Sequence, residues 1–249
     1  MIVSSNTKKP QIHASAYVAP SAVLSGDVTV EEGCAILHGA VISGEGAPVT
    51  LGANSVVMEN AVLRASGGKA MQFPLNIGES CMIGPTAYVV GATLEPGVFI
   101  ATGAKVFNGA TIEENTSVAL GAIVHVSTHL KSGQHVPMQH IAFGNPAVIY
   151  PPEQAGALRE RLQFFETVFN MPSEPEVRAK ATAAYAKFLR KTHAQDGIIV
   201  ETVKRQPAKP TGKPAEPPPT QSQDVGKVVD VMFLELHEAE MRRNAKKQQ

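Results

Sequence analysis

The chain has no excess of charge of either sign. Of its 249 residues, 22 are lysine or arginine and 22 are aspartate or glutamate, so the formal net charge is zero. It therefore lacks the large basic field with which proteins attract nucleic acid, and we expect no nucleic-acid partner. It also lacks any run of about 18 apolar residues that could cross a membrane, and its first residues, MIVSSNTKKPQIHASAY, contain no apolar segment of a secretory signal. These absences predict a cytoplasmic protein without a membrane span.

What the chain does have is an aliphatic residue at almost every sixth position from residue 12 onward. A three-residue insertion near Pro48, a longer one at residues 69–76 and one five-residue step interrupt the period, and the series is Ile12, Val18, Leu24, Val30, Ile36, Ile42, Leu51, Val57, Leu63, Ile77, Ile83, Val89, Leu94, Ile100, Val106, Ile112, Val118 and Val124. A period of six fits neither a helix nor simple strand alternation. It is typical of a parallel β-helix, in which three hexads form one triangular coil and each aliphatic side chain stacks inward on its equivalent in the next coil. We predict an all-β fold with about six coils over residues 12–129, each inward residue contributing roughly 1.5–3 kcal/mol by burial.

Because every third hexad lies on the same side of such a coil, the outward residues separate into three faces. The first face is polar and suits solvent: His13, Thr29, Glu31, Thr50, Asn76, Glu95, Thr111 and Glu113. The second is apolar and must be covered by a helix or another subunit: Tyr17, Ala19, Ala35, Leu37, Val56, Met58, Met82, Phe99, Ala101 and Ala119. The third is mixed, and it is either the place of a binding site or the polar rim of a subunit interface: Ser25, Val41, Ser43, Val62, Arg64, Tyr88, Val90, Lys105, Phe107 and His125.

The only two cysteines, Cys34 and Cys81, occupy equivalent turn positions two coils apart in this register. Coils about 4.8 Å apart place their Cα atoms roughly 10 Å from one another, too far for a disulfide. We expect both to be buried small residues and not reactive thiols.

The composition divides the chain into four regions. Residues 10–150 form the repeat domain, ending in an irregular cap, HVPMQHIAFGNPAVIYPP. Residues 151–196 carry apolar stripes with helical spacing, which are typical of packing helices. We therefore expect the β-helix to be followed by C-terminal α-helices. Residues 197–224 are a Pro-rich linker, and residues 225–249 form an amphipathic terminal helix that docks either on its own trimer or on a protein partner.

AYVAPSAVLSGDVTV at residues 16–30, the hexad spacing, the insertion before Ile77 and the closing GNPA at residues 144–147 together resemble the γ-class carbonic anhydrase family over roughly residues 10–170. The resemblance implies a left-handed β-helix and a homotrimer, with zinc held between subunits by three histidines. The corresponding positions here are Arg64, Pro85 and Val90, and none of these side chains can ligate zinc. The family's supporting Arg-Gly-Asp is Ser43-Gly44-Glu45 here. We therefore predict that the zinc site is absent and that no cofactor is bound.

The leading hypothesis for function is a metal-free trimeric scaffold, or a protein that binds a small molecule or anion through Ser43, Glu45 and Arg64, without carbonic anhydrase activity. Ion pairing of Arg64 with Glu45 or Glu59 is the structural alternative. A second hypothesis is a hexapeptide-repeat acyltransferase that uses coenzyme A, with His38 or His125 as the candidate catalytic base. A third is a metal-dependent hydratase with ligands relocated to four histidines near the end of the coils: His125, His129, His135 and His140.

Overall fold

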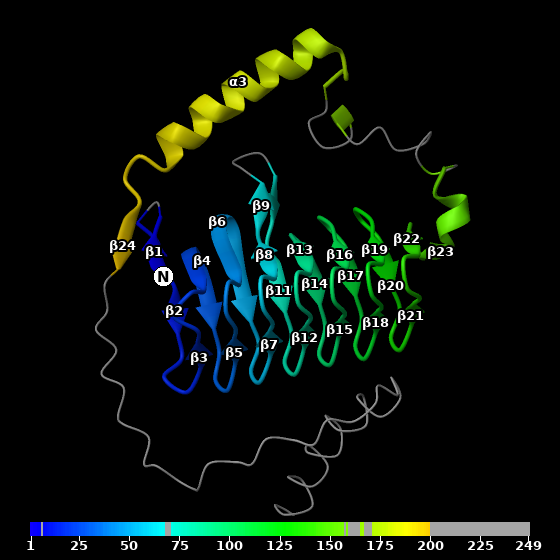
Figure 1. The fold of residues 1–249 in the computed structure, drawn as a ribbon, viewed down its shortest axis with the longest axis horizontal. Coiled ribbons are helices and arrows are strands. Elements are labelled where there is room, and N and C mark those ends of the chain that lie inside the picture. Colours follow the sequence, from blue (N-terminus) through cyan, green and yellow to red (C-terminus); the bar gives the residue numbers. More distant parts are fainter. Residues whose placement is uncertain (6, 68–70, 157, 159–164, 167–170, 200–249) are drawn as a thin grey trace, which may run out of the picture. The chain divides into compact units, whose positions relative to one another are not determined.

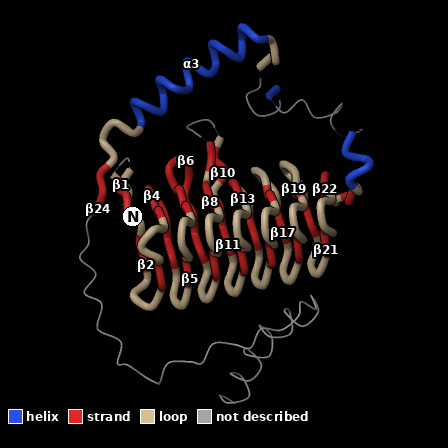
Figure 2. The backbone as a smooth tube through the Cα atoms, in the orientation of Figure 1, coloured by secondary structure: helices blue, strands red, loops and turns tan. Residues whose placement is uncertain are grey.

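The computed structural model describes residues 1–5, 7–67, 71–156, 158, 165–166 and 171–199, and it contains the predicted left-handed parallel β-helix (Figure 1). The strands stack in columns along the coil axis, one strand on top of the equivalent strand of the next coil (Figure 2). The second face is a seven-stranded sheet. The first and third faces are joined in a 15-stranded sheet, because β4 (Val23–Val30) and β6 (Val41–Leu51) each continue through both faces.

The register predicted from the six-residue period is confirmed on all three faces. On the first face β2 (Gln11–Ile12), β4, β6, β11 (Leu75–Ile77), β14 (Thr93–Leu94), β17 (Thr111–Ile112) and β20 (His129–Leu130) pair in parallel. On the second face the order is β3 (Tyr17–Val18), β5 (Ala35–Ile36), β7 (Val56–Val57), β12 (Met82–Ile83), β15 (Phe99–Ile100), β18 (Ser117–Val118) and β21 (His135–Val136). On the third face β4 and β6 are followed by β8 (Val62–Arg64), β13 (Tyr88–Val90), β16 (Lys105–Val106), β19 (Ile123–Val124) and β22 (Ile141–Phe143).

The core is the interior column of aliphatic side chains that this register creates. Leu94 lies opposite Ile112, which in turn lies opposite Leu130, and all three are at most 1% exposed. The five-residue step between Val89 and Leu94 keeps both residues inside. Burial of one aliphatic residue per hexad is therefore what holds the successive coils together.

The repeat continues further than the sequence indicated. Residues 129–143, part of which we expected to be an irregular cap, form β20, β21 and β22 and make another coil. The closing segment is the antiparallel pair of β22 with β23 (Val148–Tyr150), followed by the short helix η1 (Pro152–Gln154). Leu130, Val136 and Ala142 are fully buried and continue the inward columns of Ile112, Val118 and Val124, and this is why the regular fold extends to residue 143.

The C-terminal part of the described chain differs from prediction in two respects. Helix α3 (Pro175–Thr192) forms as expected but has no buried residue. It therefore does not pack its predicted apolar stripe against any residue that the structure describes so as to bury it. After it, Gly197–Ile199 form strand β24, where the sequence suggested the start of a linker. β24 pairs antiparallel with β1 (Ile2–Ser4), which pairs in parallel with β4, so the two strands cover the first edge of the coil.

Several predictions fall on residues outside the described part of the chain. Leu162 and Phe169, two of the four residues of the predicted stripe Leu158, Leu162, Phe165 and Phe169, lie there, as do the rest of the predicted linker and the predicted terminal helix at residues 225–249. No helix among the described residues is both long enough and apolar enough to span a membrane.

Candidate functional site

The structure brings two of the three positions that the resemblance assigns to zinc ligands side by side on the third face. Arg64 at the end of β8 and Val90 at the end of β13 are Cα partners, and Ser43 of β6 is the partner of Arg64 on its other side. Pro85 lies apart from them, on the turn between β12 and β13. Arg64 is exposed, whereas Val90 is only 6% exposed. Arg64 carries a guanidinium, Val90 an isopropyl group and Pro85 a pyrrolidine ring, and none of these groups can donate an electron pair to zinc.

The Arg64 guanidinium has no ion pair or hydrogen bond with any residue that the structure describes, so the alternative of an ion pair with Glu45 or Glu59 is not seen among them. Glu45 instead accepts a hydrogen bond from the Ser25 hydroxyl at 2.5 Å and lies 3.4 Å from the His193 ring. Of the predicted ligand-binding set, Ser43 and Arg64 therefore lie together, while Glu45 contacts other side chains.

The longer insertion forms a hairpin over this end of the third face. It consists of β9 (Ser66–Gly67) paired antiparallel with β10 (Gln72–Phe73). The Ser66 hydroxyl hydrogen-bonds the Asn108 side chain at 2.8 Å, and Phe73 lies against Gly91, where an added Cβ would be only 2.5 Å from the Cβ of Phe73. Gly91 also has a φ of +54°, so only glycine suits this corner. The sequence analysis did not identify Phe73 and Asn108 as neighbours of Val90. Gly91, directly after Val90, was the one sequence signal that another segment packs closely at this corner.

His125 lies in an aromatic column that follows the third face. Its ring centroid is 6.3 Å from that of Phe107 and 5.2 Å from that of Phe143, and Tyr88 precedes Phe107 in the column at 6.2 Å. Its Nδ1 is buried and has no hydrogen-bond partner among the described residues. Burial lowers the pKa of His125, because the charged ring would lose its hydration. The ring is therefore held neutral at physiological pH.

The other candidate histidines are dispersed. His38 follows β5, far along the chain from His125, and its Nδ1 lies 2.8 Å from the Ser21 hydroxyl. The structure does not bring together the four histidines of the relocated-ligand hypothesis: His129 pairs with Glu113 at 2.6 Å on the first face, and His135 contacts Ser117 at 2.7 Å on the second. His140 contacts the Met138 carbonyl. Among the described residues these four form no metal-binding group.

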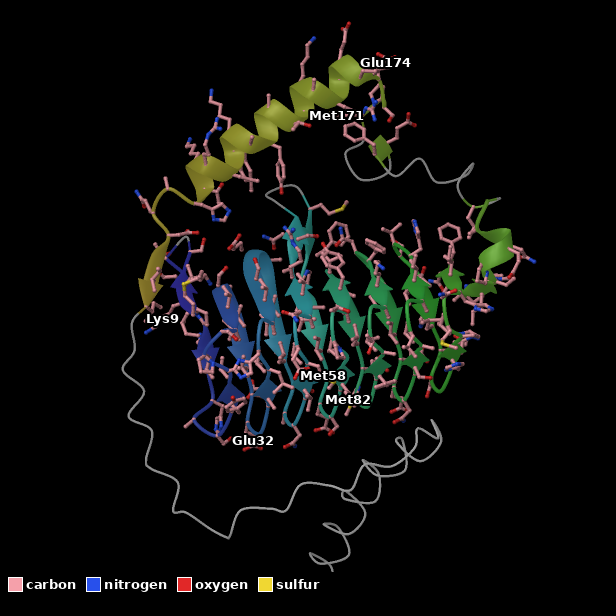
Figure 3. All side chains as sticks on the ribbon, viewed as in Figure 1. Lys9, Glu32, Met58, Met82, Met171 and Glu174 are labelled. Atoms are coloured by element: carbon pink, nitrogen blue, oxygen red, sulfur yellow. The ribbon has the colours of Figure 1, made fainter. Side chains whose placement is uncertain are left out.

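The described residues leave the second face open. Tyr17, Met82 and Phe99 are 46%, 44% and 42% exposed, and Met58 and Met82 project from the strands of neighbouring coils on this side (Figure 3). α3 buries no residue, so this helix does not cover the face. An apolar column of this kind is typical of a subunit interface.

Both cysteines behave as predicted. They are free and buried, and Ser55 lies between them, its hydroxyl accepting a hydrogen bond from the Cys81 backbone amide at 3.0 Å. Burial raises the pKa of both thiols, which disfavours the reactive thiolate.

No family model matches the chain. Gamma carbonic anhydrase 1, mitochondrial, of Arabidopsis thaliana is 28% identical over 194 residues, covering 75% of this chain and 68% of that protein. Gamma carbonic anhydrase 2, mitochondrial, of the same plant is 30% identical, covering 56% and 49%. A carbonic anhydrase of Geobacillus kaustophilus is 30% identical, covering 46% and 60%. The chain thus matches between about half and two thirds of the length of these relatives.

Among solved structures, a hexapeptide transferase family protein from Anaplasma phagocytophilum is 20% identical, covering 76% of this chain and 96% of that chain with a TM-score of 0.42. The parallel β-helix is evident in this chain's own strand pairing. The protein is a hexapeptide-repeat β-helix whose homologues include γ carbonic anhydrases and carbonic anhydrase-like proteins.

Proposed function

We propose that this protein is a homotrimeric, non-catalytic relative of the γ carbonic anhydrases that lacks the family's zinc site and binds a small anion at Arg64. The observation that carries the proposal is the position of the Arg64 guanidinium. It is exposed, it lies beside Val90 and Ser43, and it has no acidic partner among the described residues. A guanidinium of this kind suits a carboxylate or phosphate, because its planar set of N–H donors matches two oxygens at once.

The side chains of Arg64, Val90 and Pro85 argue against hydration of carbon dioxide at this position. Zinc hydrates carbon dioxide by lowering the pKa of a bound water from 15.7 to about 7. Neither Arg64 nor Val90 nor Pro85 can hold the ion in the place where the resemblance locates it, and the permanent charge of Arg64 repels a cation. A stopped-flow measurement of the purified chain at neutral pH is expected to give the rate of the buffer alone. Rapid hydration that a chelator abolishes would contradict this part of the proposal.

The homotrimer is supported by the apolar second face, which the described part of the chain leaves open. Covering Tyr17, Met82 and Phe99 with a second copy removes large apolar side chains from water at roughly 25 cal/mol per Å². In a trimer the outward column of one subunit faces the coil of the next, and Pro85, on the turn beside the second face, then lies near the interface.

Anion binding is tested with inorganic phosphate and with acetate as probes, by isothermal titration calorimetry on the full chain. Arg64→Gln removes the charge, and Lys105→Gln is the matched control, because Lys105 is another exposed cation of the third face. We expect the wild-type chain and the Lys105 variant to bind one of the probes and the Arg64 variant to lose at least tenfold in affinity. Equal binding by all three chains, or no binding by any, would overturn the proposal.

A second candidate function, acyl transfer from coenzyme A, is favoured by one specific observation. His125 is a neutral histidine whose Nδ1 has no hydrogen-bond partner among the described residues, as a general base requires. The exposed His38, which already contacts Ser21, has no such feature. Saturable binding of coenzyme A to the wild-type chain, lost in His125→Ala and kept in His38→Ala, would favour this function over simple anion binding.

The scaffold role of the terminal helix stays a prediction, because residues 225–249 lie outside the described part of the chain. Three copies on one trimer would give a multivalent surface for a protein partner. The cytoplasmic location also stays a prediction, and the plant relatives are named as mitochondrial proteins.

A further inference from the structure

One acid–histidine group includes none of the positions Arg64, Pro85 and Val90. Glu45, in the insertion within β6, meets His193 and Asp196, which lie between α3 and β24. The possible ligand atoms of the three residues lie within 4.8 Å of one another, and their side chains are 29%, 33% and 21% exposed. Two segments distant in sequence thus place one imidazole between two carboxylates.

The two carboxylates are oriented in the same way, by one serine each. The Ser25 hydroxyl donates to Oε1 of Glu45 at 2.5 Å, and the Ser5 hydroxyl donates to Oδ1 of Asp196 at 2.8 Å. Each carboxylate therefore has its second oxygen directed at the imidazole: Oδ2 of Asp196 is 2.7 Å from Nδ1, and Oε2 of Glu45 is 3.4 Å from Nε2. Hydrogen bonds that fix the orientation of carboxylate and imidazole ligands are typical of metal sites.

The distances assign different roles to the two carboxylates. At 2.7 Å, Nδ1–H donates to Asp196, and this leaves the lone pair of Nε2 directed toward Glu45. The 3.4 Å between Nε2 and Oε2 is longer than a good hydrogen bond. It matches the separation of roughly 3.4 Å between two ligands that each lie about 2.0–2.2 Å from a tetrahedral zinc ion.

We propose that Glu45 and His193 bind a divalent transition-metal ion of the zinc type, with Asp196 orienting the imidazole and water completing the coordination. One imidazole and two carboxylates, with a neutral ring, leave a net charge of about −2 for the ion to balance, and mixed nitrogen and oxygen ligands suit zinc and its neighbours. The metal occupies the gap between Nε2 and Oε2 and displaces any proton held there, so affinity rises with pH.

Such an ion would fasten the C-terminal return of the chain to the coil. His193 is the C-terminal cap of α3, and the Ser4 hydroxyl and Gly197 carbonyl join β1 to β24 directly beyond it. The ion would link this junction to β6, and so it would stabilise the two strands that cover the first edge of the coil. This site does not involve Arg64, Pro85 or Val90, and the inference does not rest on the proposed function.

The test uses the full chain, treated with chelator and dialysed, and titrated with zinc chloride by calorimetry and with cobalt(II) by visible absorption. We expect one ion per protomer. Glu45→Gln and His193→Gln should abolish binding, and Asp196→Asn should weaken it by about 10–100-fold, as loss of a hydrogen bond to a ligand does. His129→Gln is the matched control, because it removes another histidine–carboxylate pair, with Glu113, and should leave binding unchanged.

A second measurement on the wild-type chain covers the case in which a variant fails to fold. Zinc should slow the reaction of His193 with diethyl pyrocarbonate, read by peptide mass spectrometry, and should leave His129 unprotected. Absence of ion uptake by the wild-type chain, uptake that survives His193→Gln, or protection of His129 without His193 would each overturn the proposal.

Discussion

The stability of the coil should depend sharply on whether a residue points inward or outward, and Ile112→Ala tests this. Ile112 lies in β17 between Leu94 and Leu130 of the adjacent coils and is fully buried. The substitution removes about three buried carbon groups at ~0.8 kcal/mol each, or about 2.4 kcal/mol by transfer. The cavity between two stacked side chains adds to this, and large-to-small core substitutions of this kind cost about 2–5 kcal/mol in total.

The preceding residue supplies the control. Thr111 belongs to the same strand but points out of the first face, between Thr93 and His129, and is half-buried. Thr111→Ala loses only part of the preference of a β-branched residue for a strand, a loss within about 1 kcal/mol. The two variants therefore change adjacent residues of one strand whose side chains point in opposite directions.

Urea denaturation followed by far-UV circular dichroism, at one fixed protomer concentration, gives both free energies of unfolding. We expect the Ile112 variant to lose at least about 2 kcal/mol and the Thr111 variant less than about 1 kcal/mol. Equal losses, or a larger loss at Thr111, would refute the inward–outward register on which the description of the core depends.

Three further predictions concern the surface and the titratable groups. Phe99→Asp places a charge in the middle of the second face, where Phe99 is 42% exposed in the single chain, and light scattering should then show a monomer in place of the proposed trimer. Thr111→Asp on the first face should leave the mass unchanged. His125→Phe removes a buried nitrogen that has no hydrogen-bond partner among the described residues, and it should raise the free energy of unfolding by about 1 kcal/mol. A loss of stability would show that the ring has a partner outside them. Burial alone raises the pKa of Asp196, but hydrogen bonds from His193 and Ser5 outweigh it and lower the pKa below the ordinary 3.8. A carboxyl group whose pKa is lowered in the folded state stabilises the fold above its unfolded-state pKa, and this stabilisation is lost as pH falls through the folded-state pKa. In the presence of chelator, the wild-type chain should therefore lose more stability below about pH 4 than Asp196→Asn does. Parallel pH profiles of the two chains would contradict this.

The repeat domain was predictable because its rule is local and recurs. A residue such as Leu63 or Ile100 has the same environment as its equivalents six positions away, so a simple period identifies the whole interior column. The insertions near Pro48 and at residues 69–76 did not hide the register, because the period resumes after each. The extension through His135 and Ile141 was missed where proline and glycine become frequent, since turn residues alone do not distinguish an ordinary coil corner from a cap.

The candidate site was predictable only in part. The period gives the coil position of Arg64 and Val90, and so it predicted that they are neighbours on the third face. It did not predict which partner each side chain has. Glu45 was expected beside Arg64 but contacts Ser25 and His193, because the insertion within β6 directs it toward the C-terminal return of the chain.

By itself, then, the sequence determined the coil, its three faces and the residue types at Arg64, Pro85 and Val90, because a fixed translation from one coil to the next converts sequence spacing directly into spatial neighbours. The tertiary structure alone decided the contacts that do not repeat: β24 against β1, and Ser5 with Asp196, 191 positions apart along the chain. Such contacts depend on the path of the non-repeating segment between them, and no local period encodes that path.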